Sequence, residues 1–264
     1  MSTNNITIVR YGTRLGAKSE VYLNWPIYGR PDEPIEMDYF FWIIRNGDRT
    51  IVVDTGFSPE GGANRNRTFL VTPAEAFSAL GITAESAPEV LVTHAHYDHI
   101  GNLDLFPSSR VTIAAAEWEF WTSGMQNRAQ FHHSVEDAEL TELRRVHAQG
   151  RLRTFDDEIE IAPGVRMLRV GGHTPGQSIV LVDTADGRVA LASDAVHYYE
   201  EYEDDVPFAF VADLPEMYAG FDLLHEMERD GTVQHMVSGH DPDTLRRFGA
   251  IADGPLPGLT ARIG

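Results

Sequence analysis

Short runs of β-branched and aromatic residues alternate with turn residues in the first part of the chain. Such runs are typical of half-buried strands, and they occur at residues 6–10, 39–44, 50–53, 89–93 and 110–114. Between the second and third runs, Asn46-Gly47-Asp48 carries the Asn-Gly signature of a tight hairpin. Residues 72–80 predict a helix, because Thr72 can cap it and Pro73 suits its first turn.

The second part of the chain begins with a long polar segment and then returns to strands. From Glu117 to about Gly150 the residues favour helix, with Leu140, Leu143 and Val146 at helical spacing. Further elements are expected as strands at 159–161, 165–170, 178–183, 189–192 and 234–238, and as a helix at 215–229. The sequence contains no internal repeat and no linker rich in Pro, Gly and Ser. We therefore expect a single layered α/β domain over residues 1–264, with a helical insertion.

One segment combines four candidate metal ligands within six residues. It follows the predicted strand at 89–93 and contains His94, His96, Asp98 and His99. His94 and His96 lie two residues apart, so an extended backbone points both imidazoles the same way. One tetrahedral ion rarely takes four adjacent side chains, because so short a segment cannot wrap around it. Two ions that share the cluster are the simpler geometry, with further ligands supplied from elsewhere in the chain.

Three such ligands follow later predicted strands. They are His173 in a glycine-bracketed turn, Asp194 after the apolar run at 189–192, and His240 after the strand at 234–238. Sites on layered α/β sheets tend to lie beyond strand ends. The chain has no cysteine, so any metal must be held by histidine and carboxylate. Seven ligands with one bridging carboxylate fit two divalent ions; we expect zinc, although manganese, cobalt and iron suit the same donors.

The order of these motifs resembles the metallo-β-lactamase superfamily, whose signature is His-x-His-x-Asp-His followed by a downstream His, Asp and His. The match extends from Asp54-Thr55-Gly56 to His240. The resemblance implies a four-layer αβ/βα sandwich with the metals at one edge between the sheets. It implies that a first ion is held by His94, His96 and His173. It also implies that Asp98, His99 and His240 hold a second ion and that Asp194 bridges the two.

Within that superfamily, the sequence most resembles the N-acyl homoserine lactonase group. Members of this group carry a tyrosine three residues after the bridging Asp, and it contacts the substrate carbonyl. In this chain the position holds His197, followed by Tyr198 and Tyr199. An imidazole there can polarise a carbonyl or donate a proton to a leaving group. This departure favours a different substrate or pH range.

The resulting hypothesis is a metal-dependent hydrolase that opens a lactone ring, of an N-acyl homoserine lactone or a related cyclic ester, by attack of a metal-bridging hydroxide. Asp98 is the first candidate to carry a proton to the leaving oxygen, and His197 is its rival. Hydrolysis of another cyclic amide or imide, or of a thioester, on the same dinuclear site is the alternative. A glutathione thioester would call for a basic patch, which the Lys and Arg count does little to support. A metal-stabilised binding protein is disfavoured, because a structural zinc site is usually closed with four ligands.

The charge balance narrows the range of partners. The chain has 40 acidic and 21 basic residues, a net charge of −19, which disfavours general binding to nucleic acid or membrane surfaces. A small local basic site is compatible with that sum. No apolar stretch approaches the roughly 20 residues of a membrane span, and the N-terminus lacks the pattern of a secretory signal. We expect a cytoplasmic protein with a small-molecule substrate, and a homodimer as the default assembly.

Several residues near these motifs are expected to have structural roles. Asp54 is expected to accept backbone N–H bonds and to orient a ligand from behind. The histidines of the insertion, at positions 132, 133 and 147, are expected on a solvated face. The aromatic residues Trp118, Phe120 and Trp121 are expected in the core, with a hydrophobic wall over the substrate as the alternative.

Overall fold

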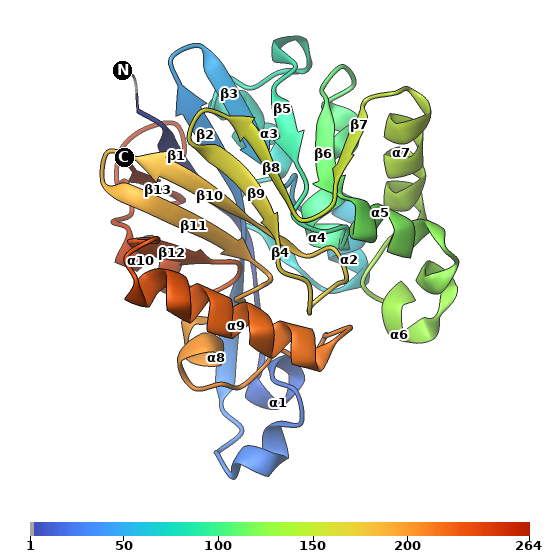
Figure 1. The fold of residues 1–264 in the computed structure, drawn as a ribbon, viewed down its shortest axis with the longest axis vertical. Coiled ribbons are helices and arrows are strands. Elements are labelled where there is room, and N and C mark those ends of the chain that lie inside the picture. The colour runs from blue at the N-terminus through green and yellow to red at the C-terminus, as the bar shows by residue number, and fades with distance from the viewer. Residues whose placement is uncertain (1–2) are drawn as a thin grey trace.

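Two β-sheets stacked face to face form the centre of the molecule (Figure 1). The structure is a computed structural model and describes residues 3–264. The strands of the first sheet, in spatial order, are β13 (Thr260–Ile263), β1 (Asn5–Ala17), β2 (Pro34–Asn46), β3 (Arg49–Val53), β5 (Glu89–Leu91), β6 (Val111–Ala114) and β7 (Leu152–Phe155), with β4 (Thr68–Phe69) paired to β1. Strands β3, β5, β6 and β7 run parallel to one another.

The second sheet is smaller and mostly antiparallel. Its strands, in spatial order, are β12 (His235–Ser238), β11 (Gly187–Ser193), β10 (Ser178–Thr184), β9 (Val165–Arg169) and β8 (Glu158–Ala162). Strand β10 is antiparallel to both β9 and β11, and β12 is parallel to β11. The carboxyl ends of β9, β11 and β12 therefore lie at one edge of the sheet.

The helices lie outside the two sheets, on their outer faces, at their edges or beyond them. They are α1 (Lys18–Val21), α2 (Pro59–Asn64), α3 (Pro73–Ala79), α4 (Tyr97–Ile100), α5 (Ala115–Thr122), α6 (Ala129–His132), α7 (Asp137–Ala148), α8 (Tyr199–Glu203), α9 (Leu214–Arg229) and α10 (Thr244–Arg247). Short 3-10 helices occur at Trp25–Tyr28, Ala84–Ser86, Leu103–Leu105 and Met125–Asn127. Within residues 3–264, no helix combines the length and the apolar character that crossing a bilayer requires.

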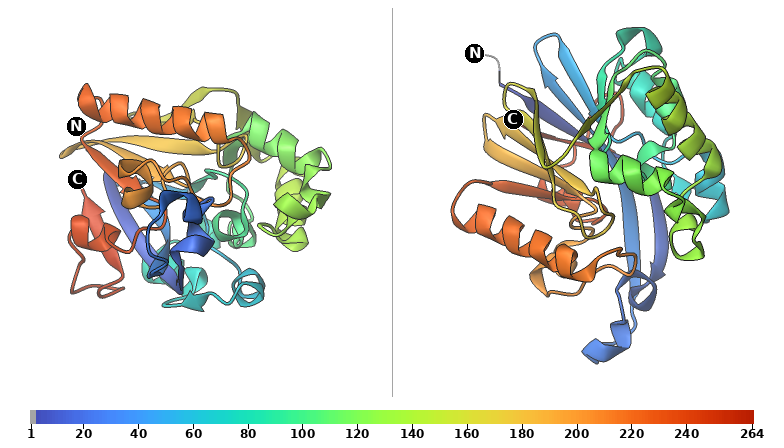
Figure 2. Two further views of the ribbon diagram at one scale, coloured as in Figure 1. Left: turned by 90° about the horizontal axis from the view of Figure 1, so that it is seen from below. Right: turned by 45° about the vertical axis from the view of Figure 1, so that its right-hand side comes forward.

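Strand β2 explains how the sheets and helices are held in layers. Successive side chains of a strand point to opposite faces, and both faces of β2 are apolar. Phe40 and Trp42 pack between the sheets, whereas Tyr39 and Phe41 pack beneath the helices of the first sheet. A third cluster joins α9 to the outer face of the second sheet through residues such as Phe221. The predicted four-layer αβ/βα arrangement is confirmed, with α9 and helices α5–α7 on the outside (Figure 2).

Local sequence signals account for several of these elements. Thr72 caps α3, because its hydroxyl accepts from the Glu75 N–H (3.3 Å) and the Glu75 carboxylate accepts from the Thr72 N–H (3.1 Å). The predicted Asn-Gly hairpin joins β2 to β3, with Gly47 in the left-handed region at φ 57°. The predicted helical insertion is confirmed as α5, α6 and α7, between β6 and β7.

The main difference from the predicted pattern is the length of the first hairpin. Strands β1 and β2 extend well beyond residues 6–10 and 39–44 and stay paired as far as Ala17 and Pro34. The hairpin projects past the sheets and ends in α1 (Figure 1). Strands β4, β7 and β13 also form without a clear apolar signal in their sequences.

Candidate metal centre

Seven predicted metal-binding side chains meet at one edge of the two sheets. His94 and His96 follow β5, and Asp98 and His99 belong to the short helix α4. The three remote side chains each follow a strand of the second sheet: His173 follows β9, Asp194 follows β11, and His240 follows β12. All seven are buried. The structure therefore brings together every donor that the sequence proposed.

The donors form two adjoining groups. The first is His94, His96, His173 and Asp194, and the second is Asp98, His99 and His240; within each group the donor atoms lie within 4.8 Å of one another. In the first group, the Nδ1 atom of His96 is 3.0 Å from Nε2 of His94 and 2.9 Å from Nε2 of His173. In the second, Nε2 of His99 and of His240 lie 3.7 and 3.8 Å from the two carboxylate oxygens of Asp98.

Asp194 lies between the groups and presents one carboxylate oxygen to each. Its Oδ2 is 3.4 Å from Nε2 of His173 and 3.7 Å from Nε2 of His94. Its Oδ1 is 3.1 Å from Nε2 of His240 and 3.3 Å from Nε2 of His99. Asp194 would therefore be placed to contact metal ions held by both groups.

The far side of two imidazoles is fixed by hydrogen bonds to backbone carbonyls. Nδ1 of His173 lies 2.7 Å from the carbonyl oxygen of Phe210, and Nδ1 of His240 lies 2.7 Å from that of Asp38. Because a carbonyl only accepts, each Nδ1 carries the proton and each Nε2 is left with a lone pair. Nε2 of His99 is buried and has no hydrogen-bond partner among residues 3–264. Such orphaned nitrogens, beside carboxylates, fit divalent metal ions.

Burial and charge set the protonation states that metal binding needs. Burial lowers the pKa of His94 and His96 well below the usual range, and it lowers the pKa of His173 to about 3. Burial alone would raise the pKa of Asp194, but the surrounding histidines, His240 first, lower it well below its usual range. Neutral imidazoles and an ionised carboxylate are the forms that bind metal.

His99 differs from these histidines because acidic groups surround it. Burial alone would lower its pKa, but Asp194, Asp54 and Asp98 outweigh burial and raise that pKa well above the usual range. The position thus favours a positive charge, which either a proton or a metal ion can supply.

Asp54 supports the second group from behind, as the sequence predicted. Its carboxylate accepts from the Thr93 N–H (2.9 Å), from the Thr93 hydroxyl (2.7 Å) and from Nδ1 of His99 (2.8 Å). Thr93 also links the two sheets, since its carbonyl accepts from the Ser178 N–H at 3.0 Å. Asp54 and Ser193 both have positive φ, 60° and 46°, which is uncommon outside glycine and concentrates at functional sites.

A second buried carboxylate, Glu117 on α5, was not predicted. It accepts from the Ala95 N–H (2.8 Å), the Trp121 indole (2.7 Å), the Thr174 hydroxyl (2.7 Å) and the Gly176 N–H (2.9 Å). It therefore ties the segment of His94 and His96 to the loop of His173. Gly176 permits this approach, because a Cβ atom there would lie 2.3 Å from the Glu117 backbone nitrogen.

His197 lies behind the metal donors. Its side chain is fully buried and stacks on Phe208, with ring centroids 3.8 Å apart. Its Nε2 is 3.2 Å from Oδ2 of Asp194, and its Nδ1 is 3.1 Å from the Glu201 carboxylate. This placement suits a residue that positions Asp194; direct contact of His197 with substrate remains a prediction.

A cavity of about 350 Å³ opens onto the donors. Its metal-side wall contains His96, Asp98, His173, Asp194 and His240, and the rest of the lining comes from Arg14, Met37, Tyr39, Asn64, Arg65, Arg67, Tyr97, His133, Ser134, Phe208 and Phe210. This volume is within the range of small-molecule sites.

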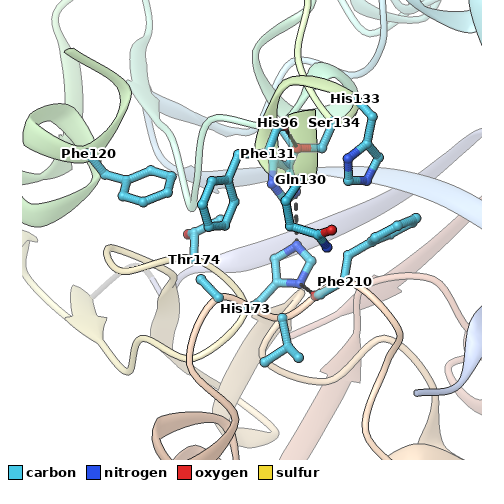
Figure 3. Close-up of a pocket in the computed structure, with 11 residues that line it drawn as sticks. His96, Phe120, Gln130, Phe131, His133, Ser134, His173, Thr174 and Phe210 are labelled. Carbon is cyan, nitrogen blue, oxygen red and sulfur yellow. Dashed lines mark hydrogen bonds between the residues drawn. The ribbon is translucent and has the colours of Figure 1, made fainter. Parts of the chain in front are cut away.

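A narrow pocket of about 20 Å³ adjoins this cavity beside His96 and His173 (Figure 3). Phe120 and Phe131 line one side of it and Phe210 the other. His133 is exposed, as expected for a solvated position, and it also lines both hollows, with its ring centroid 4.4 Å from that of Phe210.

Two aromatic residues of α5 occupy the two predicted positions, one in the core and one in a wall near the candidate metal centre. Trp121 is buried in the core against the His96 ring, with centroids 5.7 Å apart. Phe120 instead lines the narrow pocket. Several other cavity residues, Arg14, Tyr39, Arg67 and Tyr97 among them, were not predicted to have a role. Of these four residues only Arg67 has a sequence signal, because it stands close to Arg65 in an acidic chain.

The family model of the metallo-beta-lactamase superfamily matches residues 38–244. That span is more than half of the chain and holds all seven donors, so the chain belongs to the metallo-beta-lactamase superfamily. It is a metal-dependent hydrolase by family and by its two candidate metal-binding groups.

Several individual proteins similar to this chain are named as lactonases or lactone hydrolases. It is similar to an N-acyl homoserine lactonase from a Bacillus species, with 27% identity over 195 residues that cover 68% of this chain and 72% of the relative. Its fold is similar to that of an N-acyl homoserine lactone hydrolase solved with the product N-hexanoyl-L-homoserine at the catalytic metal centre, at a TM-score of 0.77 and 19% identity, covering 94% of this chain and 97% of the other. A dizinc quorum-quenching lactonase, AidC, gives a TM-score of 0.68 at 19% identity, covering 92% and 89% of the two chains.

Proposed function

We propose that this protein hydrolyses a lactone, an N-acyl homoserine lactone or a related cyclic ester, with two divalent metal ions, and that zinc is the native metal. The observation that carries the proposal is Asp194, whose two oxygens face two separate groups of histidines. The similar proteins named N-acyl homoserine lactonases support the choice of a lactone. His94, His96 and His173 would hold one ion, and Asp98, His99 and His240 the other.

When bound, such ions supply Lewis acidity and make water nucleophilic near neutral pH. The chain itself supplies the rest of the chemistry. Because the donors are buried and form one wall of the cavity, they fix where the scissile carbonyl must lie. Phe208 and Phe210 line the cavity and exclude water from its apolar part.

Asp98 is the residue that we propose to carry a proton to the leaving oxygen. It lines the cavity and its carboxylate is partly open to it, unlike that of Asp54. Its backbone is held by the Tyr11 hydroxyl, which donates to the Asp98 carbonyl at 3.1 Å. A carboxylate fixed beside the reacting ester can take a proton from the attacking water and deliver it to the departing alkoxide.

Two tyrosine hydroxyls can assist at the carbonyl or at the leaving oxygen. The hydroxyl oxygens of Tyr39 and Tyr97 lie 3.4 Å apart, and both residues line the cavity. Burial raises the pKa of Tyr39 to about 12, and it raises the pKa of Tyr97 well above the usual range. Both hydroxyls therefore stay protonated and can donate a hydrogen bond. They can therefore take over hydrogen-bond donation to the substrate from the tyrosine of the lactonase group, whose position is occupied by His197 in this chain.

Metal content and substrate hydrolysis test the proposal together. Purified protein should contain about two metal ions per chain and release protons from γ-lactones in a panel that also includes a cyclic imide, a β-lactam and a thioester. His96→Ala and Asp194→Ala should lose both metal and turnover. An Asp253→Asn control changes an exposed carboxylate remote from the donors in sequence and should behave as wild type.

The possible outcomes test the assignment of the metal site and the assignment of the substrate separately. Turnover of the imide or thioester alone would keep the metal centre and replace the lactone by one of the alternatives. Normal metal content and turnover in His96→Ala or Asp194→Ala would overturn the assignment of the donors. A protein that neither contains metal nor takes up zinc or manganese would overturn the whole proposal.

A further inference from the structure

Two arginines lie side by side in the wall of the cavity. Arg14 belongs to β1, and Arg67 directly precedes β4. These strands pair antiparallel with Thr13 opposite Thr68, so Arg14 and Arg67 are the next positions beyond that pair on each chain. Both side chains line the cavity that contains the metal donors.

Neither arginine has an acidic partner in the described part of the chain. Arg65, their neighbour, forms an ion pair with Glu136, and Arg169 forms one with Glu216 at 2.9 Å. In contrast, no carboxylate oxygen of residues 3–264 lies within 4.0 Å of a guanidinium nitrogen of Arg14 or Arg67. The Nε atom of Arg14 is buried and without a hydrogen-bond partner among those residues.

This arrangement has an electrostatic cost in the absence of a ligand. Like charges at facing positions of an antiparallel pair destabilise it, and a buried donor without a partner adds a desolvation penalty. The chain has 40 acidic residues, yet within residues 3–264 none of them forms an ion pair with either arginine. The pair is therefore suited to binding an anion that enters the cavity.

Arg67 is also oriented toward the metal-donor segment. Its Nε donates to the Tyr97 hydroxyl at 2.9 Å, and its Nη1 donates to the Arg65 carbonyl at 2.7 Å. Tyr97 stands between His96 and Asp98 in the sequence. The position of the guanidinium is thus tied to the segment that carries the metal donors.

We propose that the substrate carries an oxyanion group, a carboxylate or a phosphate, which Arg14 and Arg67 bind while its lactone carbonyl lies at the metal-donor wall. This inference rests on the proposed function and narrows its substrate to anionic lactones. A planar guanidinium is the side chain best matched to carboxylate and phosphate oxygens. The low number of Lys and Arg residues in the whole chain gives no indication of this patch, because two arginines that lie together in the fold hardly change that total.

Binding tests this proposal without turnover. The probes are glutarate, its monocarboxylate counterpart pentanoate, and 4-phosphonobutanoate, each titrated calorimetrically into the metal-loaded protein. All three offer one carboxylate to the metals, so the difference between them measures the second group alone. We expect glutarate or the phosphonate to bind about tenfold or more tightly than pentanoate, which corresponds to about 1.4 kcal/mol. The stronger of the two identifies the preferred oxyanion.

Variants then assign that difference to the two arginines. Arg14→Gln, Arg67→Gln and the double variant should lose the preference and keep the affinity for pentanoate, whereas Arg67→Lys should retain part of it. Arg166→Gln removes the same charge from a residue that pairs with Glu158 on the second sheet, and it should leave the preference intact. Thermal unfolding of each variant confirms that it is folded.

Two results would overturn the inference. One is equal affinity of the wild-type protein for all three probes; the other is a preference that survives in the folded double variant. Kinetics keep this proposal separate from the proposed function. If the dicarboxylate preference depends on the arginines but no lactone is hydrolysed, then the anion site stands and the lactonase assignment fails. If lactones are hydrolysed, then a carboxylate-bearing γ-lactone should exceed its carboxamide in kcat/KM only when both arginines are present.

Discussion

The carboxylate of Asp54 lies 2.8 Å from Nδ1 of His99, on the side of the ring opposite the candidate metal. The same carboxylate accepts both the N–H and the hydroxyl of Thr93. Asp54 therefore fixes the ring orientation of His99 through a segment that also joins the two sheets.

Asp54→Asn should weaken metal binding without unfolding the protein. The amide can no longer serve as acceptor for every donor that now reaches the carboxylate, so His99 loses its fixed tautomer. Changes of this kind typically cost about 10- to 100-fold in metal affinity or activity. Competition with a chromogenic zinc chelator measures the affinity, and Asp253→Asn is the matched control. An unchanged affinity would show that His99 is oriented by other contacts.

Glu117→Gln should lower stability by about 3 kcal/mol, because a buried donor left without an acceptor costs roughly 1–3 kcal/mol and the carboxylate receives four of them. Urea unfolding of the chelator-treated proteins measures this loss without the contribution of metal. Glu119→Gln, an exposed position on the same helix, should change stability very little. Equal stability of the two variants would contradict the role of Glu117 as a tie between loops.

Glu139 should make folding stability fall as the pH rises. Burial raises its pKa from 4.5 to about 8 in the folded protein, so the folded state holds a proton that the unfolded chain has lost. Between about pH 4.5 and pH 8 the free energy of unfolding should therefore decrease, by at most about 1.4 kcal/mol per pH unit. Glu139→Gln keeps a neutral side chain that can still accept from the Ser58 hydroxyl, and it should remove this slope.

Urea unfolding at pH 5.5 and at pH 8.5 tests this prediction. Wild type should lose stability relative to Glu139→Gln between the two values, whereas Glu226→Gln, an exposed position on α9, should follow wild type. Parallel pH profiles for wild type and Glu139→Gln would contradict a raised pKa at this residue.

Metal removal should destabilise the fold as well as abolish turnover. The donors are buried, and Nε2 of His99 has no hydrogen-bond partner among residues 3–264. A ligand present at 1,000 times its dissociation constant stabilises the folded state by about 4 kcal/mol. Differential scanning calorimetry with and without a chelator should show a lower melting temperature for the metal-free protein, restored by added zinc. An identical melting temperature would mean that the donors bind no metal.

His197→Asn should reduce activity by loosening Asp194, because the His197 Nε2 lies 3.2 Å from its Oδ2. If the role is positioning, then the variant should bind metal less tightly and regain most of its kcat when metal is supplied in excess. If His197 instead transfers a proton to substrate, then kcat should stay low at saturating metal. Metal titrations of kcat, with KM measured in parallel, distinguish the two roles.

The donors were predictable from the sequence because each carries a local signal. His94, His96, Asp98 and His99 lie within a segment of six residues. The three remote donors each follow an apolar strand. Glu117 has no such signal: it is a single acid in a helix-prone segment, and only the tertiary approach of Ala95 and Gly176 gives it a function.

The strands likewise divide into parts with a local sequence signal and parts that depend on tertiary contacts. The buried part of β2 was predicted as a half-buried strand from its run of β-branched and aromatic residues, and in the structure these side chains pack toward two cores, one on each face. The continuation of β1 and β2 was missed, because pairing persists there while the apolar alternation gives way to polar residues such as Thr13 and Arg14. Arg14 faces the cavity, where a polar side chain serves a ligand and not the core.

The long first hairpin has a consequence for how this enzyme can diversify. Arg14, Met37 and Tyr39 all come from β1 and β2, whereas the metal donors come from the ends of other strands. Part of the cavity wall is thus encoded in a stretch of sequence that contains none of the metal donors. Random libraries confined to Arg14 and Met37 can redirect the enzyme to new substrates while the metal donors and their hydrogen-bond partners stay unchanged, which makes these two positions the natural starting point for directed evolution.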